Sequence, residues 1–400
     1  MSKNSRQIYL DFAATTYVGG EVLQEMMPYF TTEYGNPASL HAFGRNAEKA
    51  LAKARTQIAK AINADPNEIY FTSGATESNN WLIRGVLGAS KIKRALVSRI
   101  EHPSVMELVK QLETEGYKID YVNVDRDGIV VVSDLVAKLA KPTALVSIMT
   151  ANNEVGTVQF LHTVASMAKE RGAIFHTDAT QAIGNVFIDV KEMNIDALSL
   201  SSHKLYGPKG IGALYIRKGC QVEKLIFGGG QERGQRSGTP NVPAAVGFGK
   251  AVELTLRDGS VNNNRMRQLR DYMIKEIETK IEHVKLNGHR TQRVPNNVHF
   301  SFAGIEGESL LMMLDFAGIA VSTGSACSSG SLERSYVLTG MGVPLEMTQG
   351  SLRMTLGRST TKEDIDYTVA ELVKVVKKLR SMSALRCDHG ARKGKNCKKC

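Results

Sequence analysis

Short apolar runs alternate with helical stretches along the first 217 residues, and this alternation constrains the fold more than any other feature. Helices are predicted at 46–62 and 160–171 and from residue 77. The runs typical of buried strands are residues 69–72, 95–98, 144–149, 173–176 and 197–200. Strands that alternate with helices indicate an α/β fold, with a mostly parallel sheet and helices on both faces.

The run at 197–200 ends in Ser201-Ser202-His203-Lys204 and then breaks at Gly207-Pro208. A lysine at the end of a buried strand can lose hydration and form a Schiff base with a carbonyl group. The alternative is an ordinary surface lysine in a turn. Open α/β sheets bind ligands at the carboxyl ends of their strands, which favours a functional role for Lys204.

Chemically able side chains follow several other strands. Residues 73–76, Ser-Gly-Ala-Thr, join a strand to a helix and could bind a phosphate through Thr76 and the backbone N–H groups, or only cap the helix. Asp178 could pair with a cationic ring nitrogen and Gln181 with a ring oxygen, or Asp178 could cap a helix. His102 could stack on a cofactor ring or move protons, or it could be a capping or core histidine. A lysine, an acid and a phosphate site on one sheet edge together predict pyridoxal phosphate.

Cys327 lies in a loop of small and hydroxylated residues, 322–331, that is unsuited to tight packing. An exposed thiol is an effective nucleophile near neutral pH, so a reactive role is predicted for Cys327. Cys220 has no such setting and is interpreted as inert. Arg353, on a predicted strand, suits a bidentate grip on a substrate carboxylate; the alternative is a surface arginine.

The composition is ordinary for a globular protein, with 42% hydrophobic and 23% charged residues. The net charge is +11, but residues 381–400 hold six Lys or Arg and one Asp, so the body is only mildly basic and no nucleic-acid groove is predicted. No apolar run approaches the roughly 20 residues of a membrane span, and the first residues are polar. We therefore expect a cytoplasmic protein that contacts neither membrane nor nucleic acid.

Eight motifs resemble those of the cysteine desulfurases, which are pyridoxal-phosphate enzymes of aminotransferase class V with the fold type I architecture. The motifs are SGATESNN (73–80), EHPSV (101–105), NNEVG (152–156), TDATQAIG (177–184), SSHKLYGPKGIG (201–212), RSGTPN (236–241), STGSACSSGSLERSYVL (322–338) and SLRMTLGR (351–358). The resemblance runs from about residue 7 to residue 380, and it favours the housekeeping or nitrogen-fixation branch with the longer loop.

The resemblance implies a role for each residue. Lys204 binds pyridoxal phosphate covalently, His102 stacks on its ring and helps proton transfer, and Cys327 attacks the sulfur of bound L-cysteine. Arg353 binds the substrate carboxylate. The implied cofactor-binding residues are Lys204, Ala75, Thr76, Asn153, Asp178, Gln181, Ser201, His203 and Thr239, the last reaching the site of a neighbouring subunit in a homodimer.

The function implied is conversion of L-cysteine to L-alanine, with the sulfur carried as a Cys327 persulfide to an iron–sulfur scaffold or another acceptor. A selenocysteine lyase, another class V lyase or aminotransferase, and a sulfur-carrier or scaffold protein with a metal-binding tail are the alternatives. The expected division is a large cofactor-binding domain at 15–255, a small α+β domain at 1–14 and 256–380 that carries the Cys327 loop, and a basic tail at 381–400.

Two features depart from the family pattern. Arg334 stands where many relatives have proline. The tail contains Cys387, His389, Cys397 and Cys400, which together could bind zinc or an iron–sulfur unit, could relay sulfur, or could have no ligand. Cys327 is also a candidate for transient ligation of a cluster.

Overall fold

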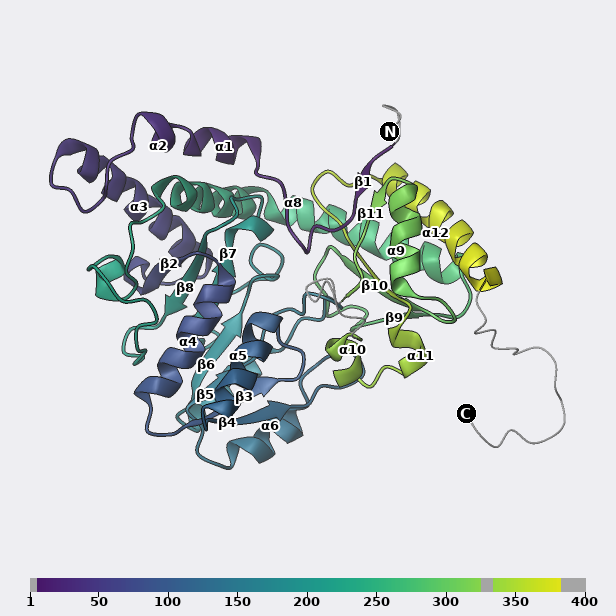
Figure 1. Cartoon of the computed structure of the whole chain (residues 1–400), viewed down its shortest axis with the longest axis horizontal. Coiled ribbons are helices and arrows are strands. Elements are labelled where there is room, and N and C mark those ends of the chain that lie inside the picture. Colours follow the sequence, from purple (N-terminus) through teal and green to yellow (C-terminus); the bar gives the residue numbers. More distant parts are fainter. Residues whose placement is uncertain (1–5, 325–333, 383–400) are drawn as a thin grey trace.

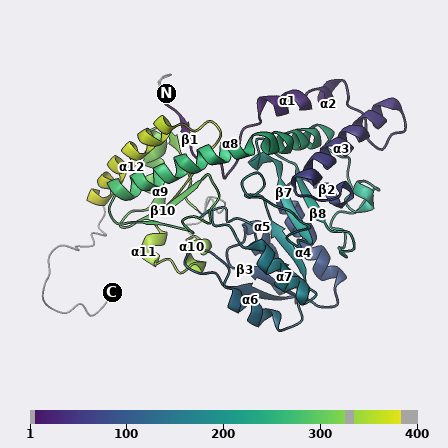
Figure 2. The same ribbon diagram turned by 180° about the vertical axis from the view of Figure 1, so that it is seen from behind.

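The computed structural model describes residues 6–324 and 334–382 (Figure 1). One part is built on a seven-stranded sheet, and the other contains two smaller sheets. Helix α8 (Val242–Lys280) runs through both parts, as the front and back views show (Figures 1 and 2). Within the described ranges, no helix is long and apolar enough to cross a membrane.

The large sheet has the strand order β2-β8-β7-β6-β5-β3-β4. Its strands are β2 (Ile69–Thr72), β3 (Arg94–Ser98), β4 (Lys118–Val122), β5 (Leu145–Ser147), β6 (Ile174–Asp178), β7 (Ala197–Ser201) and β8 (Gly212–Ile216). All pairs are parallel except those of β8, which runs antiparallel to both β2 and β7. The mostly parallel sheet predicted from the alternating pattern is therefore confirmed.

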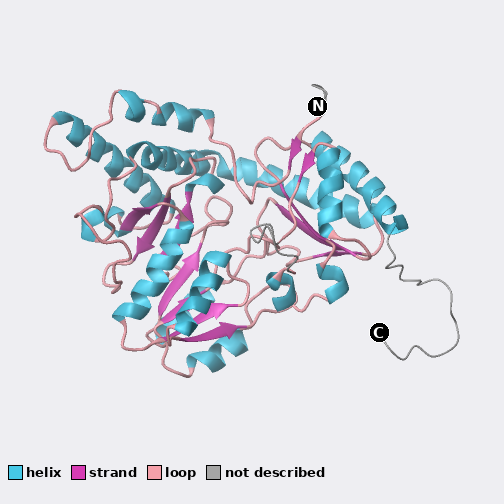
Figure 3. Ribbon diagram, viewed as in Figure 1, coloured by secondary structure: helices cyan, strands magenta, loops and turns pink. Residues whose placement is uncertain are grey.

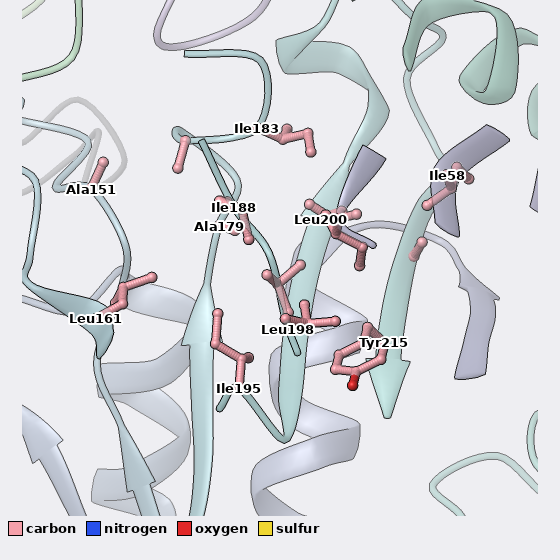
Figure 4. Close-up of a cluster of buried hydrophobic side chains, with 14 of the residues drawn as sticks. Ile58, Ala151, Leu161, Ala179, Ile183, Ile188, Ile195, Leu198, Leu200 and Tyr215 are labelled. Atoms are coloured by element: carbon pink, nitrogen blue, oxygen red, sulfur yellow. The ribbon is translucent and has the colours of Figure 1, made fainter. Parts of the chain in front are cut away.

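Helices cover both faces of this sheet (Figure 3). They include α3 (Ala42–Ala61), α4 (Ala75–Ala89), α5 (Pro103–Thr114), α6 (Val132–Leu139) and α7 (Leu161–Glu170), whereas α1 (Gly20–Met26) and α2 (Pro28–Thr31) pack against α8. Side chains alternate along each strand, so Ala197 joins the core under α4 and α5, whereas Leu198 joins the core under α3, α6, α7 and α8. Figure 4 shows part of the core that contains Leu198, together with Leu200 and Tyr215.

The smaller part contains two sheets and a separate core. β1 (Ile8–Tyr9) pairs in parallel with β11 (Ile319–Ala320), and β10 (Asn297–Phe302) lies between β9 (Val284–Leu286) and β12 (Ser351–Thr355) with antiparallel pairing. Its helices are α9 (Gly307–Phe316), α10 (Tyr336–Gly340), α11 (Leu345–Thr348) and α12 (Lys362–Met382).

The sequence pattern also predicts a helix at 265–281, and its predicted start is wrong, because α8 is one helix of 39 residues that begins at Val242. Gly247 and Gly249 look like helix breakers in the sequence, but they allow close packing. A Cβ on Gly247 would lie 2.5 Å from Met26 Sδ, and one on Gly249 would lie 2.8 Å from Ala54 Cα. The boundary predicted near residue 255 therefore falls inside a helix, and the division into domains stays a prediction.

Candidate active site

A cavity of about 570 Å³ opens at the carboxyl ends of the parallel strands. Segments from both parts of the molecule line it, including the chain at 13–15 and Arg353 on β12. The predicted site residues that line it are Ala75, Thr76, His102, Asn153, Asp178, Gln181, Ser201, His203, Lys204 and Arg353. The fold thus brings together residues spread over almost 280 positions of sequence, although their individual roles stay predictions.

Lys204 projects into this cavity from a short 3-10 turn after β7. Its Nζ donates hydrogen bonds to the carbonyl oxygens of Ala13 and Ala14, at 2.5 and 2.7 Å. Two residues later, Tyr206 has a left-handed backbone with φ of 62°, and its N–H donates to Thr16 Oγ1. Such a conformation costs free energy for a bulky residue and persists only where surrounding contacts hold it. The contacts to 13–16 therefore fix the chain that carries the lysine.

A chain of hydrogen bonds through the buried side chain of Asn79 joins Asp178 to His102, two residues that line the cavity. Asn79 Nδ2 donates to Asp178 Oδ2 and to Ser104 Oγ, each at 2.8 Å. His102 Nδ1 lies 2.9 Å from Ser104 Oγ and accepts the Ser104 N–H. Because Nδ1 accepts from the backbone, the neutral ring carries its proton on Nε2. Burial lowers the pKa of His102, which favours this neutral form.

The N-terminus of α4 forms another wall of the cavity. Its N-cap residue is Gly74, which has an extended backbone and no side chain to cap the helix. The first backbone N–H groups of the helix, at Ala75 and Thr76, are thus available to an anion. This arrangement suits a phosphate group.

His203 lies near the same wall, with its Nδ1 3.1 Å from Thr15 Oγ1. Burial, reinforced by the positive charges of Lys204 and Lys209, lowers the pKa of His203 to about 4. A neutral imidazole can donate one hydrogen bond to a phosphate oxygen while the lysines supply the positive charge.

These groups fit pyridoxal phosphate on grounds independent of the sequence motifs. The uncapped start of α4 suits the phosphate, the carboxylate of Asp178 suits a protonated pyridine nitrogen, and Lys204 supplies the amine. In addition, Thr180 Oγ1 is buried with no hydrogen-bond partner among the described residues, although Thr180 lines the cavity. A buried hydroxyl without a partner is costly, and a bound ligand with polar groups would offer it one.

Arg353 is buried at the boundary of the two parts, on β12. Its Nη2 forms an ion pair with Asp11 Oδ1 at 3.0 Å, and its Nη1 donates to the carbonyl oxygen of Asn153 at 3.0 Å. Its Nε is buried with no hydrogen-bond partner in the described part of the chain. The guanidinium group is therefore held in place while retaining capacity to bind a carboxylate.

Some predicted residues are not brought to this cavity by the described chain. Thr239 does not line it. Cys327 and the tail residues Cys387, His389, Cys397 and Cys400 lie outside the described residues. Within the described ranges, no group of three or more His, Cys, Asp or Glu residues could hold a metal ion.

Several polar residues of this site escaped the sequence interpretation, and Asp11 and Asn79 are the most informative of them. Asp11 pairs with Arg353, and Asn79 joins Asp178 to Ser104. Asn79 lies within the SGATESNN motif, but only Thr76 and Ala75 were assigned there. Nothing local marks Asp11, because its partner lies 342 residues away.

Comparisons with known proteins agree with this geometry. The sequence pattern described as aminotransferase class-V matches residues 8–368, so the chain belongs to that family. A protein named cysteine desulfurase IscS from Clostridium botulinum (strain Hall) is 49% identical over 389 residues, covering 96% of this chain and 98% of the relative. One of the same name from Dictyoglomus turgidum is 50% identical over 380 residues, covering 94% and 96%.

A solved structure described as a NifS-like protein superposes with a TM-score of 0.88 at 38% identity, covering 94% of this chain and 100% of that one. Within class V, these similarities place the chain in the cysteine desulfurase family. The resemblance inferred from the motifs is confirmed, and membership implies pyridoxal phosphate as the cofactor.

Proposed function

We propose that this protein is a pyridoxal-phosphate-dependent cysteine desulfurase that acts in the cytoplasm and supplies sulfur for iron–sulfur cluster assembly. The main support is one cavity that collects Lys204, Asp178, His102, Arg353 and the uncapped start of α4. Relatives about half identical over nearly the whole chain carry the name cysteine desulfurase. L-Cysteine is the substrate that follows from this family.

Bound pyridoxal phosphate would withdraw electrons from the amino acid attached to it. Arg353 would hold the substrate carboxylate, and Asp178 would keep the ring nitrogen protonated. His102, neutral and with its proton on Nε2, would transfer protons near the reacting carbons. Lys204 would bind the cofactor and exchange its place with the substrate amine.

Cys327 would then take the sulfur. Its thiolate forms an S–S bond with the substrate sulfur while the substrate Cβ–S bond breaks and Cβ gains a proton. L-Alanine leaves, and Cys327 keeps the sulfur as a persulfide for a second protein. Cys327 serves as the carrier in this step, because one sulfur atom has to pass from the substrate to an acceptor protein.

Two variants test the proposal. Lys204→Ala should lose the visible absorbance of the covalently bound cofactor, whereas the parent protein should show it. Cys327→Ala should keep that absorbance but release sulfur from L-cysteine far more slowly than the parent. Sulfur release at the parent rate in Cys327→Ala would overturn the persulfide route and favour a selenocysteine lyase or another class V lyase.

The proposed assembly is a homodimer in which Thr239 reaches the cofactor phosphate of the partner subunit. Thr239 follows the glycine-rich stretch at 228–230 by nine residues and does not line the cavity of its own chain. Large apolar side chains are exposed in two segments that could form the subunit interface. Phe227, just before the glycine-rich stretch, is 80% exposed, and Leu40, in the loop after α2, is 91% exposed. Light scattering should give twice the chain mass of 43.7 kDa, and Thr239→Ala should weaken cofactor binding. A monomeric holoenzyme would contradict the assembly.

The proposal for the tail is a zinc or iron–sulfur site formed by Cys387, His389, Cys397 and Cys400. Support comes from the sequence alone, because a Cys-x-His followed by a Cys-x-x-Cys supplies four suitable ligands. Zinc and iron should be measured in the full chain and in a chain that ends at Ser381. Equal metal content in the two proteins would exclude the site.

A further inference from the structure

The described residues on either side of the Cys327 segment meet at one buried carboxyl group. Glu154, only 4% exposed, lies in the turn after β5. On one side of the segment, Ser335 Oγ donates a hydrogen bond to Glu154 Oε2 at 2.6 Å, and this contact is buried. On the other side, Gly324 lies so close that a Cβ added to it would be 2.5 Å from the same oxygen. The carboxyl group is therefore hydrogen-bonded to the chain just after residues 325–333 and lies close to the chain just before them.

The backbone of Glu154 is fixed from several directions. The side-chain oxygen of Asn152 accepts the N–H groups of Glu154 and Val155, each at 2.9 Å. Asn297 Nδ2 donates to the Glu154 carbonyl oxygen at 2.9 Å. All of these polar groups are buried, so breaking one of the contacts would leave an unsatisfied group. Glu154 thus provides a rigid point of attachment.

Ser335 is held as firmly as its partner. It is the N-cap of α10, where its Oγ accepts the Leu338 N–H at 3.1 Å while donating to Glu154. A hydroxyl that accepts one hydrogen bond and donates another is polarised, which strengthens both. The start of α10 is therefore tied to the turn of Glu154.

Both ties lead directly to the candidate active site. Asn153, the neighbour of Glu154, lines the cavity and accepts a hydrogen bond from Arg353 through its carbonyl oxygen. Tyr336, the neighbour of Ser335, donates its hydroxyl to the carbonyl oxygen of Glu101, which precedes His102. The chain that follows the Cys327 segment is therefore hydrogen-bonded to the two turns that carry the predicted site residues Asn153 and His102.

We propose that Glu154 is a positioning residue for sulfur transfer: its hydrogen bond to Ser335, with Gly324 packed close to the same oxygen, fixes where the described chain on either side of residues 325–333 lies beside the cavity. The inference rests on the proposed persulfide route. Because Glu154 has no proposed contact with the substrate, its removal should slow sulfur transfer to Cys327 while leaving the affinity for L-cysteine unchanged. Burial also raises the pKa of Glu154 to about 7, so both its ionised and neutral forms accept the Ser335 hydroxyl near neutral pH.

The test compares Glu154→Ala, Glu154→Gln and Ser335→Ala as holoenzymes. Glutamine keeps an oxygen that can accept from Ser335, so Glu154→Gln should transfer sulfur near the parent rate. Glu154→Ala and Ser335→Ala should each slow persulfide formation on Cys327 in a single turnover by about tenfold, the usual effect of losing a buried hydrogen bond. Ser301→Ala, which removes a buried hydroxyl from β10 that contacts Asn287, is the matched control and should retain the parent rate.

Two further readouts separate positioning from simple loss of structure. A titration with L-cysteine, followed by cofactor absorbance, should give the same affinity for L-cysteine in Glu154→Ala as in the parent. Hydrogen exchange of the Leu338 backbone N–H should be faster in Glu154→Ala than in the parent. Combining Glu154→Ala with Ser335→Ala should add no further loss, because both variants break the same contact. An affinity loss equal to the rate loss, or a rate loss shared by Ser301→Ala, would overturn the proposal.

A steric test uses the opposite side of the segment. Gly324→Ala should impair persulfide formation in the parent, because its methyl group would overlap Glu154 Oε2. The same substitution should cost less in a Glu154→Ala background, where that overlap is gone. Additive losses would contradict the shared attachment point. Sulfur release at the parent rate in Cys327→Ala would refute the proposed function itself. If Cys327→Ala is slow but the Glu154 variants form the persulfide at the parent rate, only the positioning role of Glu154 is refuted.

Discussion

Substituting Glu101 by glutamine should change how the stability of this protein depends on pH. Glu101 is fully buried; its Oε1 accepts the Ser98 hydroxyl and the Met149 N–H, while Oε2 has no hydrogen-bond partner among the described residues. Burial, together with the nearby charge of Asp178, raises the pKa of Glu101 from 4.5 to about 8. The carboxyl group is thus neutral in the folded protein near pH 7 but ionised in the unfolded chain.

The sign and size of the effect follow from proton linkage. A carboxyl group whose pKa is raised on folding stabilises the folded state fully below its unfolded pKa, and this stabilisation is lost as pH rises through the folded pKa. Between the two values, the loss is about 1.4 kcal/mol for each pH unit. From about pH 5.5 to 7.5, the parent should therefore lose roughly 2.7 kcal/mol relative to Glu101→Gln, which has no proton to release.

Guanidinium unfolding at several pH values measures this difference. Trp81 is the single tryptophan, and it is buried on α4 next to the large sheet, so its fluorescence reports the part that contains Glu101. The side-chain amide nitrogen that Glu101→Gln introduces would have no hydrogen-bond partner, which lowers the stability of the variant. Because this cost is the same at every pH, it does not affect the predicted difference in pH dependence between the parent and Glu101→Gln. Ser98→Ala removes a hydrogen bond that favours the ionised form of Glu101, so the pKa of Glu101 in the folded variant should rise further. The stability of Ser98→Ala should therefore continue to fall with pH beyond the point where that of the parent levels off. Parallel curves for the parent and Glu101→Gln would refute the reasoning.

Three further outcomes are expected. Asp178→Asn should retain the cofactor but form alanine roughly 100-fold more slowly, because an amide cannot keep the ring nitrogen protonated; an unchanged turnover number would contradict this. Glu232→Ala should lower the free energy of unfolding by about 3–5 kcal/mol, since it strands the bidentate partner Arg55 in a largely buried site; guanidinium unfolding measures it. Asp11→Asn should raise KM for L-cysteine by about 3- to 10-fold with kcat little changed, because Arg353 loses its ion-pair partner; steady-state kinetics with an unaltered KM would argue against that role.

The sheet and the members of the site that follow its strands were predictable from the sequence for a physical reason. A buried parallel strand is a short apolar run, and whatever follows it arrives at the same edge as its neighbours. Asp178 and Lys204 were located in this way, since each comes within a few residues of a run's end. For Arg353 the strand pattern alone could not distinguish a binding role from a surface one, and only the resemblance favoured the binding role.

The contacts that could not be predicted join segments far apart in the chain. The partner of Asp11 and the bridge made by Asn79 depend on how two parts of the molecule pack, and periodicity carries no such information. The boundary predicted near residue 255 falls inside helix α8, whose first half contains Gly247, a residue of low helix propensity that here lets α1 approach closely. In both cases tertiary packing, absent from any local window, decides the outcome.

The segment at 8–16 has a consequence for the order in which the protein can mature on the ribosome. β1 needs β11 as its partner, and Ala13 is held by Thr355, yet the carbonyl oxygen of Ala13 is what receives Lys204. The seven-stranded sheet is complete once residue 216 has been made, long before β11 or Thr355 leaves the ribosome. Domains fold as they emerge, so the nascent chain should hold a finished sheet with an open site. The wall behind the lysine can close only after Thr355 has emerged, which places cofactor capture well after the large sheet has formed.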